Sequence, residues 1–88
     1  MPEPGEAEAY QAYQAVRRAH ELGRAVRTLR EARGWSQGEL AEVARVNRPV
    51  VARFEAGGTV PTLPVLERLA QALEVDLVVT LTPREPTG

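Results

Sequence analysis

The apolar residues of the first third of the chain recur at the three- and four-residue spacing that is typical of amphipathic helices. This pattern predicts an additional N-terminal helix over residues 6–21 and a second helix over residues 22–33. Gly23 lies at the boundary, where it either kinks the first helix or separates it from the second, and Gly34 ends the second as a C-terminal glycine does. The residues predicted to line the inner faces of these helices are Ala9, Tyr13, Val16, Ala19, Leu22, Val26 and Leu29.

Capping signals predict two short helices in the middle of the chain. The sequence SQGE is a capping box, with Ser at the N-cap and Glu three residues later, so a helix is expected over residues 36–44. After a short break, Pro49 fits the first turn of another helix, whose N-cap is Asn47 or Arg48 and whose end is marked by Gly57. The residues predicted to face inward are Leu40, Ala41, Val43, Ala44, Val51 and Phe54.

The last third of the chain changes its period. Thr62, followed closely by Pro64, predicts a further helix that ends near Leu73. Over residues 76–82 apolar and β-branched residues then alternate with period two, which predicts a β-strand. The residues predicted to be buried on the helix are Leu66, Leu69, Ala70 and Leu73.

The predicted strand has no β-type partner elsewhere in the chain. An unpaired strand leaves its backbone groups without hydrogen bonds, so its natural partner is the same strand of a second copy, antiparallel across a two-fold axis. The alternative is a loosely extended tail. Residues 1–5 and 83–88 are expected to be disordered. The expected fold is an all-α, lambda-repressor-like bundle of about five helices, with one C-terminal β-strand pairing across a dimer. The residues assigned to this dimer contact are Leu77, Val78, Val79, Thr80 and Leu81.

Composition narrows the class of protein. With 88 residues the chain is long enough for one domain, and without Cys it has neither disulfides nor thiolate metal sites. No apolar run approaches the ~20 residues of a membrane span, and the acidic N-terminus is unlike a signal peptide, so we expect a cytoplasmic protein with no membrane partner. His20 is the only histidine, and no Ser-His-Asp or Cys-His set can be assembled. We therefore expect no metal, no cofactor and no enzyme activity.

The positive charge is concentrated in the middle of the chain. Residues 22–57 carry seven Arg and four Glu, whereas the segments on either side are each net negative and the whole chain has a formal net charge of -1. A nucleic-acid surface would need such a basic segment, although a solvated helix face would give the same count. All eleven basic residues are Arg, whose guanidinium suits bidentate contacts with phosphate and guanine.

The segment SQGELAEVARVNRPVVARFEAG, residues 36–57, resembles the helix-turn-helix of Cro/CI-type repressors (the Xre family), and the likeness extends over residues 22–75. The residues that carry it at family spacing are Gln37, Leu40, Ala41, Val46, Val51, Phe54, Glu55 and Gly57. This resemblance implies a domain whose second short helix enters the major groove of DNA. The chain departs from the family at three positions, where Gly, a hydrogen-bonding residue and Asn are replaced by Arg45, Pro49 and Ala56.

The resemblance also implies roles for individual residues. Gln37 is expected to hydrogen-bond a phosphate at the start of the first short helix. Arg48 and Arg53 are expected to read bases through bidentate contacts with guanine, with phosphate contact as the alternative. Arg30 and Glu55 are expected to form a structural ion pair. The complete set of expected DNA-binding residues is Gln37, Asn47, Arg48, Pro49, Ala52 and Arg53.

The C-terminal segment refines the resemblance. A Cro/CI-type domain that ends in a strand is similar to the HipB-type and HigA-type antitoxins, whose terminal strands pair across the dimer. We interpret the chain as a homodimer that binds a palindromic operator in double-stranded DNA and represses transcription. The alternative is an antitoxin that also neutralises a cognate toxin, through residues 7–21 or the outer face of the strand.

Overall fold

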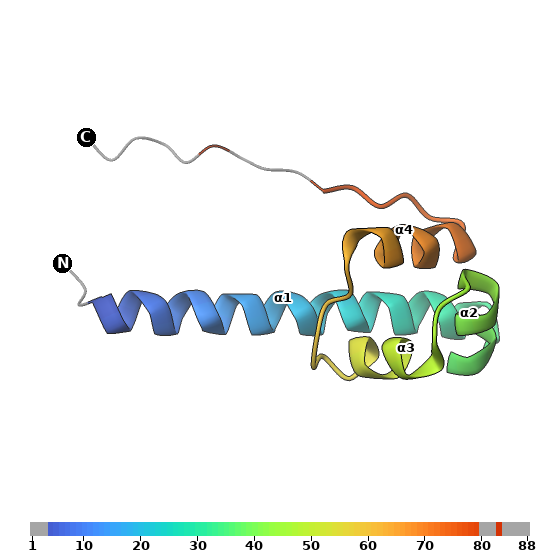
Figure 1. Ribbon diagram of the computed structural model, residues 1–88, viewed down its shortest axis with the longest axis horizontal. Coiled ribbons are helices and arrows are strands. Elements are labelled where there is room, and N and C mark those ends of the chain that lie inside the picture. Colours follow the sequence, from blue (N-terminus) through green and yellow to red (C-terminus); the bar gives the residue numbers. More distant parts are fainter. Residues whose placement is uncertain (1–3, 80–82, 84–88) are drawn as a thin grey trace.

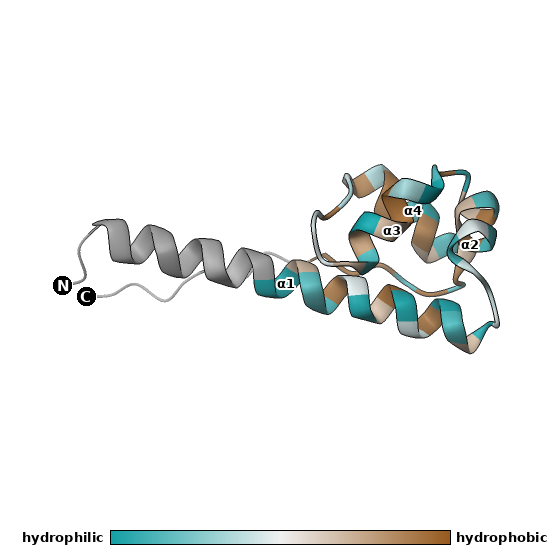
Figure 2. Cartoon of the chain, turned by 90° about the horizontal axis from the view of Figure 1, so that it is seen from below, coloured by the Kyte–Doolittle hydropathy of each residue, from teal (hydrophilic) through white to brown (hydrophobic). Residues whose placement is uncertain are grey.

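The computed structural model describes residues 4–79 and 83, and the side chains of residues 17–79 and 83. In Figure 1, one long helix runs along the molecule, a short helix lies across its C-terminal end, and the other two appear above and below it, while the view of Figure 2 shows both of them on the same side of the long helix. The helices of the described residues are α1 (Pro4–Ala32), α2 (Gln37–Ala44), α3 (Arg48–Glu55) and α4 (Leu63–Ala72). The principal packing pairs are α1 with α3, and α2 with both α3 and α4.

The helix α1 is continuous over 29 residues, where the sequence predicted two helices. Gly23 does not interrupt it. Instead, Gly23 marks the place where α1 lies against the end of α3, because a Cβ here would overlap the carbonyl oxygen of Phe54 and lie 3.1 Å from its carbonyl carbon. The glycine therefore serves a close approach between helices. The all-α prediction is confirmed, with four helices among the described residues in place of about five.

All four helices end in the same backbone conformation. The left-handed residues at these ends have φ between 56° and 82°, and in each case the next N–H donates to the carbonyl five residues before it, at 2.9–3.2 Å. This is the Schellman motif. The four left-handed residues are Gly34, Arg45, Gly57 and Glu74. The predicted glycine stops are thus confirmed, whereas Arg45 and Glu74 carry side chains in a conformation that favours glycine.

The predicted starts of the two short middle helices are also present. The Ser36 hydroxyl accepts a hydrogen bond from the Glu39 N–H at 3.1 Å, and the Ser36 N–H donates to the Glu39 carboxylate at 3.2 Å, which completes the capping box. Asn47 is the N-cap of α3, without a side-chain capping bond, and Pro49 lies in the first turn. Local sequence therefore determines where these two helices begin.

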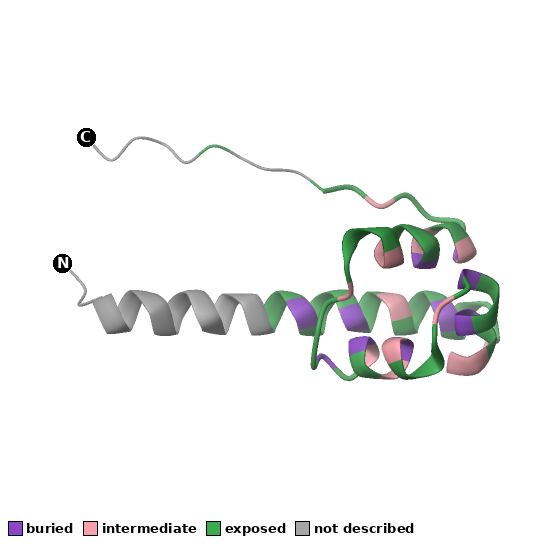
Figure 3. Cartoon of the chain, in the orientation of Figure 1, coloured by how far each residue is buried: buried purple, intermediate pink, exposed green. Residues whose placement is uncertain are grey.

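The core lies where the helices face one another. Figure 3 shows the buried residues of α2, α3 and α4 turned toward the inside, and Figure 2 shows hydrophobic residues on the same sides. Three residues predicted to face inward are exposed: Leu22 and Leu29 on α1 are 42% and 36% exposed, and Val43 on α2 is 53% exposed. The apolar faces of α1 and α2 thus extend beyond the part that the described core covers. The core consists of buried residues from α2, α3 and α4, together with the C-cap residue of α4. These residues are Leu40, Ala41, Ala44, Val51, Phe54, Leu69 and Leu73.

After α4 the chain continues in extended form. Residues 75–79 have no regular secondary structure, and Val78 and Val79 are 76% and 64% exposed. Residues 4–79 contain no β-strand, and Thr80 and Leu81 lie outside the described residues. A strand needs a neighbour with which to share hydrogen bonds, and the described residues of this single chain offer none. Pairing of the tail across a dimer therefore stays a prediction.

Candidate nucleic-acid interface

The helix α3 has one face in the core and another open to solvent. Val51 and Phe54 are fully buried and hold the inner side of the helix against the domain, as the sequence predicted. The opposite side, which we call the outer face of α3, consists of the exposed Arg48, Pro49 and Arg53 and the half-buried Ala52. The N-cap residue Asn47 is exposed as well. A short helix with one free face is what a major groove can admit.

The two arginines of the outer face have no ion-pair partner among the described side chains. Neither Arg48 nor Arg53 donates a hydrogen bond or forms an ion pair with any side chain in residues 17–79, whereas Arg27, Arg30 and Arg33 are all paired. The stem of Arg48 lies beside the first turn of α2, since its Cδ is 3.9 Å from the place of a Cβ at Gly38. The start of α2 and the Arg48 side chain at the start of α3 thus lie together.

Behind the outer face, a buried ion pair fastens α3 to α1. The Glu55 carboxylate accepts hydrogen bonds from Nε and Nη2 of Arg30, both at 2.8 Å, and Nη1 of Arg30 donates to the Trp35 carbonyl at 2.6 Å. The Arg30 and Glu55 side chains are 11% and 3% exposed. The hydrogen bond with Glu55 is the main reason why the pKa of Arg30 lies above its ordinary value. This pair, which the family resemblance implied, fixes the end of α3 and leaves its outer face free.

Gln37 belongs to the same cluster. Its Nε2 donates to Glu55 Oε1 at 3.2 Å, and the residue is half-buried at the edge of the ion pair. A carboxamide nitrogen carries two hydrogens, so one is left for an acceptor outside the domain, such as the phosphate that the resemblance implied. Sequence reasoning missed the bond to Glu55 because the two residues lie 18 positions apart and only the fold brings them together.

A second contact that the sequence did not reveal joins the ends of α1 and α4. Nη2 of Arg33 donates to the Glu74 carboxylate at 2.9 Å, and the guanidinium carbon of Arg33 lies 5.0 Å from the ring centre of Trp35. Trp35 is half-buried against the cluster that contains Leu40. Arg33 and Trp35 thus stabilise the connection between α1 and α2 from its outer side.

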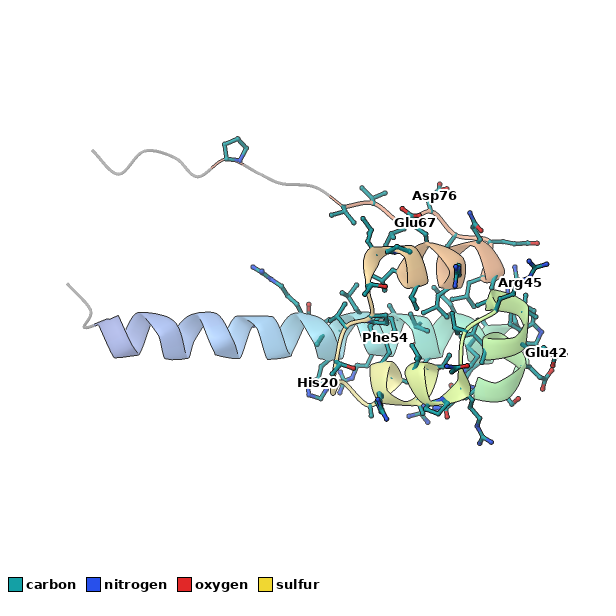
Figure 4. All side chains as sticks on the ribbon, in the orientation of Figure 1. His20, Glu42, Arg45, Phe54, Glu67 and Asp76 are labelled. Carbon is teal, nitrogen blue, oxygen red and sulfur yellow. The ribbon has the colours of Figure 1, made fainter. Side chains whose placement is uncertain are left out.

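The remaining polar residues do not form a second kind of site. His20 (labelled in Figure 4) is exposed, and its ring lies against Gly57, where any Cβ would overlap it. In the part of the chain that the structure describes, no three His, Asp or Glu side chains come close enough together to hold a metal ion. None of the four helices combines the length and the apolar character that a membrane span requires.

Comparison with known proteins agrees with this geometry. The family described as "Helix-turn-helix domain" matches residues 21–81. The crystal structure of the restriction-modification controller protein C.AhdI from Aeromonas hydrophila is 33% identical with a TM-score of 0.64, and the match covers 66% of this chain and 88% of the controller. A structure described as "MDT Protein" is 25% identical with a TM-score of 0.61, covering 74% of this chain and 92% of that one. No curated protein matches the chain.

Proposed function

Because the chain belongs to the helix-turn-helix domain family, whose match spans residues 21–81, we propose that it is a dimeric transcriptional regulator that reads a palindromic operator with α3. The Cro/CI-type resemblance is confirmed by the family match together with the likeness to the controller protein C.AhdI, and a helix-turn-helix domain implies DNA as its partner. One observation carries the finer proposal. The outer face of α3 presents two arginines that have no side-chain partner among residues 17–79, on a helix held from behind by a buried ion pair.

In this proposal each residue of the surface has a separate task. Arg48 and Arg53 donate paired hydrogen bonds to guanine O6 and N7 in the major groove. Gln37 keeps its bond to Glu55 and gives its second amide hydrogen to a phosphate, which fixes the position of the domain on the duplex. The side chains of Ala52 and Pro49 carry no hydrogen-bond donor, so they contribute apolar contact with a thymine methyl group.

Dimerisation would follow from the extended tail. Two copies that pair residues 76–82 as antiparallel strands have a two-fold axis, and a palindromic operator has the same symmetry. The half-site centres are expected to lie one helical turn apart, about 34 Å, or a multiple of that spacing. Repression would result when the bound dimer blocks polymerase from the promoter, and the protein acts by binding alone, without catalysis.

The antitoxin alternative stays a prediction. Neither solved neighbour is described as an antitoxin or as bound to a toxin. A gene for a ribonuclease-like or kinase-like toxin beside this one would be the observation that favours it.

The proposal is tested by replacing Arg48 and measuring DNA binding. A specific duplex is first selected from fragmented genomic DNA with the full chain, and its affinity is measured by fluorescence anisotropy at several salt concentrations. Arg48→Ala is expected to weaken specific binding by about 1–3 kcal/mol per half-site, roughly 5- to 150-fold, because it removes a bidentate base contact. Wild-type affinity is expected to fall as salt rises, because phosphate contacts release counterions.

Arg68→Ala is the matched control, since Arg68 is an exposed arginine on α4 and lies outside the outer face of α3. It should leave the affinity within about twofold of wild type, because it contacts no base in the proposed complex. Folding of both variants is checked by circular dichroism. If Arg48→Ala binds the selected duplex as tightly as Arg68→Ala does, Arg48 does not read the operator and the proposed orientation of α3 is wrong.

A further inference from the structure

A narrow apolar groove separates α1 from α4. Its volume is about 150 Å³, and its floor reaches Phe54 and Leu69, two of the most deeply buried side chains of the domain. Figure 4 shows Phe54 pointing from α3 toward this region, and Asp76 on the tail that forms its outer rim. The side chains that form its walls include Leu22, Val26 and Leu29 from α1, Leu66 and Leu73 from α4, and Leu77 from the tail.

The groove explains why two leucines of α1 are exposed. Leu22 and Leu29 were predicted to face the core, and they do lie on the apolar side of α1, yet they are 42% and 36% exposed because α1 and α4 are not a principal packing pair. Val75 on the opposite rim is 37% exposed. Exposed apolar surface that continues down to the centre of a core is characteristic of an interaction site.

The chemistry of the walls selects the kind of occupant. Asp76 is the only charged residue among the groove walls, so the groove lacks the basic side chains with which a protein holds DNA phosphates. Small-molecule pockets are usually about 300–1,000 Å³ and contain several convergent polar groups, and this groove is smaller and almost wholly apolar. Aliphatic side chains of another polypeptide fit these walls best.

The tail identifies that polypeptide. Residues that alternate along an extended segment share a face. The odd-numbered residues Val75, Leu77 and Val79 are all apolar, and Leu77 already lies half-buried at the groove, whereas Val78 points away and is 76% exposed. No backbone group from Asp76 to Val79 forms a hydrogen bond with any other described residue. The same segment therefore has an unpaired strand edge and an apolar face at the rim of the groove.

We propose that a second copy of this chain covers the α1–α4 groove, with the two tails paired and their odd-numbered side chains turned down onto the grooves. This rests on the proposed dimer and extends it, because the interface then includes Leu22 and Leu29 of α1 as well as the tail. Leu77 belongs to both the strand and the rim, and Val75 on the rim directly precedes the strand, so a copy that pairs with the tail lies over the groove. The outer face of α3 belongs to neither surface and stays free for DNA.

The test compares two substitutions that each place a charge on an exposed apolar residue of a helix. Leu22→Glu places a carboxylate on the rim of the groove, and Val43→Glu places one on α2, outside the groove walls. Sedimentation equilibrium of the full chain should show a dimer dissociation constant raised at least tenfold by Leu22→Glu and less than twofold by Val43→Glu, because only the first buries an unpaired charge in the interface. Circular dichroism verifies that both variants remain helical.

A measurement on the wild type removes any dependence on the folding of a variant. Methyl resonances of Leu22 and Leu29 should shift on dilution with the same midpoint as dimer dissociation, while those of Val43 should not. If Val79→Asp dissociates the dimer but Leu22→Glu does not, and the Leu22 methyl resonances of the wild type are insensitive to dilution, only the strands pair and the groove inference is wrong, while the proposed function stands. A wild type that is monomeric at all concentrations and on its operator overturns the dimer and the groove together.

Discussion

Removal of the Glu55 carboxylate should be among the most destabilising single changes in this domain. In Glu55→Ala, Nε and Nη2 of Arg30 lose their hydrogen-bond partner while the side chain is only 11% exposed, which leaves the Trp35 carbonyl as acceptor and the exposed Glu31 carboxylate 3.9 Å from Nη2. Gln37 loses its partner in the same step. Removing one member of a buried ion pair typically costs about 3–5 kcal/mol, and we expect about 3 kcal/mol here because Arg30 keeps one hydrogen bond. That is a large fraction of the roughly 4–13 kcal/mol expected for a chain of this length.

The surface of α1 offers a control pair with the same Nε–carboxylate distance. Nε of Arg27 donates to Glu31 at 2.8 Å, the same distance as Nε of Arg30 to Glu55, but these side chains are 63% and 54% exposed. Glu31→Ala should leave the melting temperature almost unchanged, because water replaces the lost partner. The two experiments thus compare a buried carboxylate with an exposed one at the same Nε–carboxylate distance, although Glu55 also accepts from Nη2 of Arg30 and from Gln37, and Glu31 also lies 3.9 Å from Nη2 of Arg30.

The assay is thermal unfolding followed by circular dichroism, at one fixed protein concentration because dimerisation would shift the midpoint. A loss of about 3 kcal/mol corresponds to a Tm lower by roughly 12–24 °C for a domain of this size. The double variant Arg30→Met with Glu55→Leu should recover much of the loss, since apolar side chains can replace a buried pair. If Glu55→Ala lowers Tm no more than Glu31→Ala, the carboxylate does not fasten α3 to α1.

Further predictions concern the backbone. Gly23→Ala should destabilise the domain by about 1–3 kcal/mol despite its better helix propensity, because its Cβ would overlap the Phe54 carbonyl oxygen, whereas Gly38→Ala, whose Cβ would have neighbours no closer than 3.8 Å, should stabilise α2 by about 0.5–1 kcal/mol. Arg45→Gly should stabilise by about 0.5–1 kcal/mol, because Arg45 has φ 59° and glycine adopts this conformation without strain. Urea unfolding measures all three changes, and equal effects of Gly23→Ala and Gly38→Ala would contradict the close approach of α1 and α3.

Features that depend on neighbouring residues in the chain could be predicted from the sequence. The capping box at Ser36 and the stop at Gly57 involve hydrogen bonds that span only a few residues, so a short segment contains all the information. The inward positions of Val51 and Phe54 follow from helical periodicity in the same way. The family pattern added the Arg30–Glu55 pair, which no local rule would have joined.

Features that depend on other helices could not be predicted. Gly23 looked like a break because glycine is a poor helix former, and only the position of α3 reveals that it allows close contact. Leu22 was expected in the core because periodicity reports that a face is apolar and not which surface covers it. Glu74 gave no signal for a left-handed conformation, because non-glycine residues seldom adopt it and the Schellman hydrogen bonds that hold it there form only in the folded chain.

The shortness of α3 limits how many base pairs one copy of the protein can read. Eight residues of helix extend about 12 Å, so α3 laid along a duplex faces only three to four base pairs. A four-base word recurs by chance roughly every 250 base pairs, far too often for one helix to find a unique address among the competing sites of a chromosome. Two such helices at a fixed separation must match two words at once, so the average spacing between chance matches is squared. The second copy therefore supplies sequence information that no substitution in α3 could add.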